Sequence, residues 1–310
     1  MNNMRPGVYC SHNINLVDNT YKYPPIGIIL KGDTNKIVPI NDDATALASF
    51  GKSSYGYKVY SILKENIGSD IFACFCDDVS FNQSATDLFA KVYAVISLFP
   101  YDKIPTVLEN KLFFCNIGSS QNPISTANAI NNKRVLFSYP KVTLESTDTD
   151  DIGCVFLAVL SLKKEKISFN GYTSDLSESE KNSLLYNGVS VFEKQYEGYV
   201  NAVRVVTSCS LDENKAHSDS FLDVSTVIAI DEILATLKSC LQNAFLDNTA
   251  TKGYITAILM EQLELMKNNK LIESFKTPAI IQKGSVLNIS VCVEVFKSAM
   301  QMFLNLNFNI

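Results

Sequence analysis

Apolar and polar residues alternate along the last eleven residues of the chain, from 300 to 310. This period of two is typical of a β-strand with one buried and one solvated face. The apolar positions are Met300, Met302, Leu304, Leu306, Phe308 and Ile310, and only Phe303 departs from the alternation. A strand this apolar at a chain end would promote aggregation if it stayed unpaired. We therefore expect it to pair with a strand of its own domain or of another subunit.

Strand-like and helix-like patterns alternate through the first half of the chain. The apolar runs that predict strands are 26–30, 38–40, 71–76, 112–117 and 135–139, and the segments that predict helices are 43–50, 57–65, 85–98, 126–131 and 152–162. Connections of this length suit the crossovers that parallel strands require. The first half is therefore predicted to be an α/β layer domain with a largely parallel sheet covered on both faces.

The second half mixes helices with hairpin-like strands. Ser177 and Glu180 form a capping box at the start of a helix that is expected to end near residue 187. The segments expected after it are a hairpin at 189–192 and 199–207, a long helix with the apolar stripe Val227, Ile230, Leu234, Leu237, Leu241 and Phe245, a helix at 251–267, and strands at 286–295 and 300–310. This half is predicted to be α+β.

The composition indicates a protein that forms contacts with other proteins. Hydrophobic residues make up 46% of the 310 residues and charged residues only 19%, which leaves little charge to solvate the surface of a monomer. The net charge of -5 argues against a dedicated nucleic-acid binder. No apolar run approaches the roughly eighteen residues of a membrane-spanning helix, so no membrane insertion is expected.

The start of the chain, Met-Asn-Asn-Met-Arg-Pro-Gly, lacks the apolar core of a signal peptide. We therefore expect synthesis in a reducing cytoplasm, where the eight cysteines remain thiols.

Side chains that could carry chemistry are sparse. His12 and His217 lie in polar segments and are interpreted as solvated loop residues, and the Cys74–Cys76 pair has no second ligand pair nearby. Gly51-Lys52-Ser53 lacks the earlier glycine of a phosphate loop. We predict no catalytic, cofactor or metal site and hence no enzyme. Acidic pairs such as Asp150–Asp151 leave an acid–base pair open. The alternative function is a cytosolic α/β enzyme or nucleotide-binding module without a recognisable motif.

Several motifs, in their order along the chain, resemble those of contractile tail sheath proteins, which form the outer cylinder of myophage tails, R-type bacteriocins and contractile injection systems. In the first half they are Arg5-Pro6-Gly7-Val8-Tyr9, the strand 26–30, and Val38-Pro39-Ile40 followed by a helix ending at Phe50-Gly51. In the second half they are 176–180, Leu184-Leu185, Gly188-Val189, Glu197-Gly198, 203–207 and 221–226. The resemblance covers residues 5–60 and 170–310. Ser208 stands where the family often has threonine, and the chain is short for a sheath.

The resemblance implies four segments: an N-terminal arm (1–23), an α/β sheath domain (24–170), an α+β sheath domain (171–298) and a C-terminal arm (299–310). In such sheaths both arms add strands to the sheets of adjacent subunits, which keeps the subunits linked during contraction. The arm residues implied here are Pro6, Gly7, Val8, Tyr9, Leu304, Leu306, Phe308 and Ile310.

The resemblance also implies partners. A helix of the second domain would face the inner tube through Glu261, Glu264, Lys267 and Lys270, although an ordinary solvated helix face remains the alternative. The implied partners are other copies of the chain, the inner tail tube protein, and baseplate and terminator proteins. The expected location is a virion tail or a released contractile particle assembled in the bacterial cytoplasm. A non-sheath component of the same machine is a third hypothesis.

Overall fold

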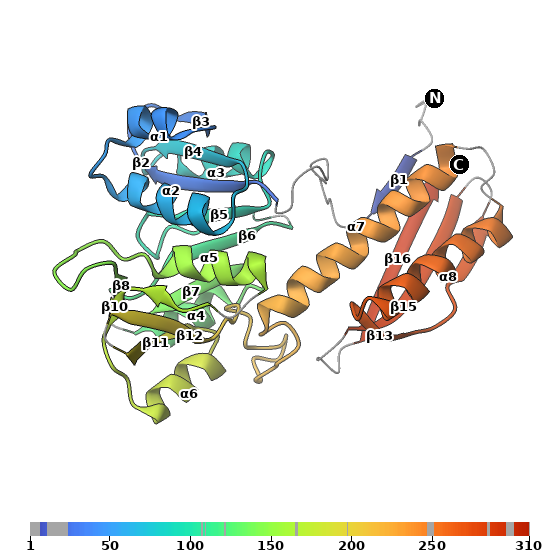
Figure 1. Cartoon of the computed structure of the whole chain (residues 1–310). Helices are drawn as coiled ribbons and strands as arrows, with labels where there is room; N and C mark the ends of the chain where they lie inside the picture. Colours follow the sequence, from blue (N-terminus) through green and yellow to red (C-terminus); the bar gives the residue numbers. More distant parts are fainter. Residues whose placement is uncertain are drawn as a thin grey trace. The chain divides into compact units, whose positions relative to one another are not determined.

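The computed structural model describes residues 7–10, 24–106, 108, 110–120, 122–164, 167–196, 198–246, 251–283, 286–295 and 301–309; for 7–10 and 301–309 it describes the backbone alone. The chain divides into two compact units (Figure 1). One is Val17–Val224, called here the α/β unit. The other combines Met1–Leu16 with Ser225–Ile310 and is called the terminal unit.

A nine-stranded sheet in the order β3-β4-β2-β5-β6-β7-β11-β12-β9 forms the centre of the α/β unit. Its strands are β2 (Ile26–Lys31), β3 (Lys36–Ile40), β4 (Ile71–Cys76), β5 (Ala94–Ser97), β6 (Leu112–Asn116), β7 (Val135–Tyr139), β9 (Phe169–Asn170), β11 (Ser190–Tyr196) and β12 (Tyr199–Arg204). The six strands from β4 to β11 are parallel, while β3, β12 and β9 pair antiparallel at the two ends. The predicted parallel sheet is confirmed. A separate ribbon pairs β8 (Val142–Thr143) with β10 (Tyr172–Thr173).

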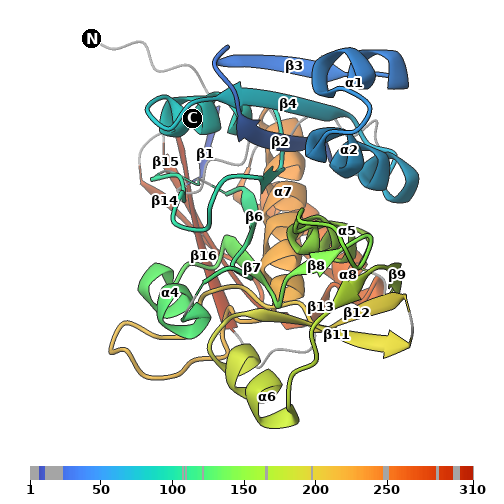
Figure 2. The same cartoon turned by 90° about the vertical axis from the view of Figure 1, so that its left-hand side faces the viewer.

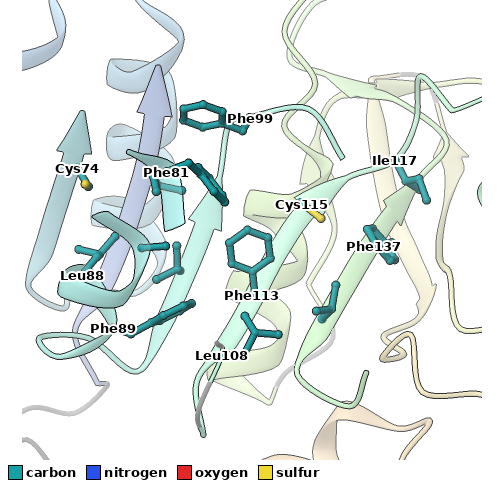
Figure 3. Close-up of a cluster of buried hydrophobic side chains, with 14 of the residues drawn as sticks. Cys74, Phe81, Leu88, Phe89, Phe99, Leu108, Phe113, Cys115, Ile117 and Phe137 are labelled. Atoms are coloured by element: carbon teal, nitrogen blue, oxygen red, sulfur yellow. The ribbon is translucent and has the colours of Figure 1, made fainter. Parts of the chain in front are cut away.

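Helices cover both faces of this sheet because successive residues of each buried strand point to opposite sides. The helices are α1 (Asp43–Phe50), α2 (Tyr55–Asn66), α3 (Phe81–Phe89), α4 (Pro123–Ile130), α5 (Gly153–Lys163) and α6 (Glu178–Tyr186). Phe113 and Cys115 of β6 belong to a core cluster with Phe81, Leu88 and Phe89 of α3 (Figure 3). The same cluster includes Ala127 of α4 and Leu184 of α6. The intervening Leu112 and Phe114 are buried outside that cluster, and α5 packs against β5, β6 and β7. Figure 2 shows α2 and α5 together on one side of the strands and α4 on the other.

Local signals placed most helix ends correctly. Asp42 caps α1 by accepting from the Thr45 N–H at 2.7 Å, and Gly51 follows the helix at φ 78. The predicted capping box is confirmed, since Ser177 and Glu180 bond to each other's backbone at the start of α6.

The helix predicted at 85–98 is wrong in its second half. Helix α3 ends at Phe89, and Ala94–Ser97 form strand β5, in which all four residues are buried. A short, continuously apolar run has the same periodicity whether it is a buried strand or a buried helix. The β-branched Val95 and Ile96 were the available signal for a strand.

The terminal unit contains an antiparallel sheet in the order β1-β16-β15-β13, with β14 also beside β15. Its elements are β1 (Gly7–Cys10), α7 (Val224–Leu246), α8 (Lys252–Asn268), β13 (Ile272–Phe275), β14 (Ala279–Lys283), β15 (Val286–Val295) and β16 (Gln301–Asn309). Helix α8 packs against β13 and β14, two short strands that the sequence did not reveal. The fold class, α/β followed by α+β, is confirmed.

The division between the two units lies at Val224–Ser225, not at the predicted boundary of residues 170 and 171. Strand β11 continues the parallel sheet by pairing Ser190 with Ser138 of β7, and β12 then pairs with β9. The sheet therefore extends across the predicted boundary. Periodicity identifies a hairpin but not the sheet that it joins, so this boundary could not be read from local pattern.

Candidate assembly surfaces

Strand β16 forms the longest ladder of the terminal unit. All nine of its residues pair with β15, from Gln301 opposite Glu294 to Asn309 opposite Val286. The register places Leu304 opposite Val291, Leu306 opposite Ile289 and Phe308 opposite Leu287. The three β15 residues are at most 1% exposed, and directly opposite residues of an antiparallel pair share one face of the sheet. The apolar positions of the predicted arm therefore match the buried face of β15.

Strand β1 lies on the other edge of β16. Val8 pairs with Phe308 and Tyr9 with Asn307, and Gly7 pairs with Asn309. The structure thus brings together the two segments that the sequence predicted as arms, within one chain and one sheet. Pro6 and Ile310 lie outside the described residues. Exchange of these strands between subunits stays a prediction.

Helix α8 has a buried face and an exposed face. Ile255, Leu259, Leu263 and Met266, at spacings of three and four, form the buried face. The predicted tube-facing residues Glu261, Glu264 and Lys267 are all exposed, and Lys270 is exposed just beyond the end of the helix.

The exposed face of α8 also carries apolar side chains that the sequence interpretation missed. Tyr254 is 40% exposed and Leu265 is 47% exposed. Their spacings to Glu261, seven and four residues, place all three on one side of the helix. This face is therefore a mixed surface of apolar and charged groups. A helical-wheel projection that first placed the buried residues on one side would have shown Tyr254 and Leu265 on the exposed side.

The cluster that most resembles an enzyme site lies at the carboxyl end of β6. The Asn116 side-chain oxygen accepts from the Ser138 hydroxyl and from the Cys154 N–H, both at 2.7 Å. Its amide nitrogen donates to the Tyr55 hydroxyl at 3.3 Å and to the Asp151 carbonyl oxygen, which also accepts from the Tyr55 hydroxyl. The amide of Asn116 thus makes four hydrogen bonds within the protein.

The Asp151 carboxylate holds the loop before α5. It accepts from the backbone N–H groups of Val142 at 3.0 Å and Gly153 at 3.1 Å. Burial raises the pKa of Asp151 to about 6, while these two donors act in the opposite direction. A Cβ on Gly118 would lie 2.8 Å from the second carboxylate oxygen, so glycine permits this close approach. Lys58 of α2 binds the same loop through Asp148 and Asp150, each at 2.9 Å. The cluster thus binds the loop before α5 to strand β6, to α2 and to the segment around Val142.

The remaining candidates also lie in structural contacts. His217 lies in a loop, as predicted, and is only partly solvated, because it stacks on Tyr186 with ring centroids 3.5 Å apart and its Nε2 atom lies 3.0 Å from the Asp219 carboxylate. His12 lies outside the described residues. Cys74 and Cys76 are buried. Among the described residues, no group of three or more His, Cys, Asp and Glu is arranged to hold a metal ion. Within the same ranges, no helix has both the length and the apolar character to cross a bilayer.

Comparison with known proteins identifies the fold but not a sequence family. No family model matches the chain, and no curated protein matches it. A solved sheath tail protein from Desulfitobacterium hafniense is similar over 98% of this chain and 100% of its own, with a TM-score of 0.66 and 8% identity. A sheath tail protein from Listeria innocua is similar over 92% of this chain and 94% of its own, with a TM-score of 0.66 and 9% identity. The fold of this chain is therefore that of solved sheath tail proteins.

Proposed function

We propose that this chain is the structural subunit of a contractile tail sheath, which polymerises around an inner tube and contracts by rigid-body rearrangement of its subunits. The observation that carries the proposal is the similarity of fold to sheath tail proteins over nearly the whole of both chains. The sequence motifs in residues 5–60 and 170–310 also support it, because they resemble those of contractile tail sheath proteins.

The proposed link between subunits is strand exchange at the terminal sheet. Strands β1 and β16 pair with each other, and β16 pairs with β15 on its other edge. Any copy of the chain carries the same two strands, so a neighbour's β16 would form the same register with β15. Main-chain hydrogen bonds would supply affinity, and the alternating apolar positions would define the register. Links of this kind can persist while the folded units move as rigid bodies.

The proposed contact with the inner tube is the exposed face of α8. Leu265 and Tyr254 offer a small apolar area, and Glu261 and Glu264 lie beside them. Exposed charges contribute little affinity in water and act mainly on specificity. A contact of this composition would be weak enough to break during contraction. Baseplate and terminator proteins would bind the ends of the polymer, assembled in the bacterial cytoplasm as part of a virion tail or a released particle.

The test is assembly of the expressed full chain, followed by negative-stain electron microscopy. We expect hollow, striated tubes from the wild type. A variant lacking 301–310 should give at least tenfold less sedimentable polymer than the wild type, because β15 loses the nine-residue strand β16 as its partner. Its α/β unit should keep its thermal transition, since β16 contributes no strand to that sheet.

The matched control for the deletion is Lys64→Met, which alters an exposed ion pair of the α/β unit and should leave assembly unchanged. Compact monomers from the wild type at every concentration would contradict the proposed function. Unchanged polymer from the deletion variant would contradict strand exchange while leaving the sheath fold intact.

The contact with the tube has its own test. Glu261→Lys together with Glu264→Lys should reduce co-sedimentation with the inner tube protein, while polymerisation of the sheath chain alone is unaffected. The double variant Lys36→Glu, Lys91→Glu, placed on the α/β unit, is the matched control for charge reversal. If both variants bound the inner tube protein equally well, the exposed face of α8 would not be the contact with the tube.

A further inference from the structure

Strand β15 has no unpaired edge in the single chain. One edge is bonded to β16 from Val286 to Glu294. The other is bonded to β14, with Ser290 opposite Ala279, and to β13, with Val295 opposite Ile272. Each residue on one edge of a strand can pair with only one partner strand at a time. A second copy's β16 can therefore reach this position only after the chain's own β16 has left it.

The other edge of β16 is partly closed as well. Strand β1 pairs with residues 306–309 of β16, so both ends of the chain lie in one ladder. Release of β16 from β15 would therefore also detach β1 from the sheet or from β16.

We infer that the free subunit is self-capped: β16 paired with β15 of its own chain blocks the polymerisation edge, and opening of this ladder limits assembly. The inference rests on the proposed function, because it concerns the same edge of β15. Closed and exchanged ladders have identical residue pairs, so their contact energies are nearly equal.

Concentration then decides between the closed and exchanged ladders. Five residues, 296–300, join β15 to β16. A short connection of this kind gives the tethered strand an effective concentration on the order of millimolar. Free subunits well below that concentration would pair with themselves. Such self-capping would keep an apolar strand from pairing at random with other chains before assembly.

A native cysteine allows this ladder to be locked. Cys292 of β15 stands directly opposite Phe303 of β16 and is partly exposed. Opposite residues of an antiparallel pair have Cα atoms about 4.5–5.5 Å apart, which lies within the range that a disulfide can bridge. Phe303→Cys also replaces the one residue that departs from the alternation of apolar and polar positions.

The experiment oxidises the full-length Phe303→Cys variant before and after assembly. Oxidation of dilute monomer should form an intramolecular disulfide, and the locked monomer should give at least tenfold less sedimentable polymer than the reduced variant. Reduction should restore assembly. Oxidation of assembled tubes should instead link subunits into a ladder on a non-reducing gel. The control is Cys292→Ser, Phe303→Cys, which keeps the new thiol and removes its partner; its assembly should not respond to oxidant.

The outcomes separate the two proposals. A locked monomer that polymerises as well as the reduced one would overturn self-capping while leaving the sheath function in place. Formation of the disulfide without any polymer from the reduced variant or the wild type would overturn the sheath function, and with it the regulatory role of the ladder. Hydrogen exchange on wild-type monomer gives an independent measurement. Amides of 301–309 should exchange at least a hundredfold more slowly than those of an unfolded chain, and unprotected amides would overturn self-capping.

Discussion

The two sheets of this protein are built in different ways. The α/β unit draws its strands from one continuous stretch of chain and joins most of its parallel strands through crossovers that contain helices, β5 to β6 being the exception among the described residues. The terminal unit takes one strand from each end of the chain and pairs all of its strands antiparallel. A central parallel strand cannot change partners without unpacking the helices that connect it. A terminal strand can leave and re-enter an antiparallel ladder. In the proposed function, the α/β unit would move as a rigid body and the terminal sheet would link neighbouring subunits.

The largest expected effects come from truncating one buried side chain in the core of each unit. Phe113→Ala should lower the free energy of unfolding of the α/β unit by about 3–5 kcal/mol, because the ring is fully buried. It packs edge-on against Phe89, with the two ring centroids 6.5 Å apart. Urea denaturation measures the loss. Hydrogen exchange should accelerate in β5, β6 and β7 and remain unchanged in β15 and β16.

Ile289→Ala is the matched substitution in the terminal sheet. Ile289 is fully buried on β15 opposite Leu306, and the truncation should lower the free energy of unfolding of the terminal unit by about 2–5 kcal/mol. Here exchange should accelerate in β15 and β16 but not in β6. If both variants accelerated exchange everywhere, the two units would unfold as one, and the distinction between them would fail.

A smaller effect is expected from the buried carboxyl group of the α/β unit. The pKa of Asp151 is about 6 in the folded chain, above the value of about 3.9 expected for an unfolded one. The stability that this group contributes is fully present below pH 4 and is lost as the pH rises through 6. Between pH 5 and pH 7 the free energy of unfolding should fall by about 1–1.5 kcal/mol on this account.

Asp151→Asn should remove that pH dependence, because the amide does not titrate in this range. Denaturation curves at pH 5, 6 and 7 measure it. If the free energy of unfolding changed by the same amount in the wild type and in the variant between pH 5 and pH 7, the prediction for Asp151 would be wrong. Deletion of 301–310 should not alter the dependence, since Val142 and Gly153, whose N–H groups bond to this carboxylate, belong to the α/β unit.

A weaker contribution comes from Lys58, which joins α2 to the loop before α5. Lys58→Met should lower the free energy of unfolding by about 0.5–1 kcal/mol, since the ammonium group binds both Asp148 and Asp150 but remains partly exposed. The loss should shrink at high salt, where exposed charges are screened. A cost that is independent of salt would assign the contribution to packing of the lysine stem instead.

The smallest effect is expected on the exposed face of α8. Glu264→Lys should change the free energy of unfolding by less than about 0.5 kcal/mol, because the side chain is exposed. Thermal denaturation checks this value. A larger loss would show that the residue supports the terminal sheet and is not reserved for a partner.

Much of the fold followed from local pattern. The strands predicted at 71–76, 135–139 and 286–295 match β4, β7 and β15 to the residue. The helix predicted at 85–98 failed because β5 is buried on both faces and carries no alternation. The boundary predicted at residue 170 failed because β11 joins the first sheet by pairing with β7, a contact between residues some fifty positions apart.

The candidate site shows the same limit. Alternation alone predicted β16 and its apolar positions, but it left open which strand would pair with them. On α8 the charged positions were found, whereas the exposure of Tyr254 and Leu265 became clear only once the buried stripe was known. Apolar residues on an exposed face look the same in sequence as apolar residues of a core.

The sequence by itself determined most of the helices and strands, two of the helix caps and the apolar face of the last strand, because these depend on neighbours two to four residues apart. The tertiary structure alone decided the sheet order, the division at Val224–Ser225, and the meeting of both chain ends beside β15. Those features depend on contacts between distant residues, which local periodicity does not encode. The pairing of β16 with β15 of its own chain is the contact on which the proposed self-capping rests.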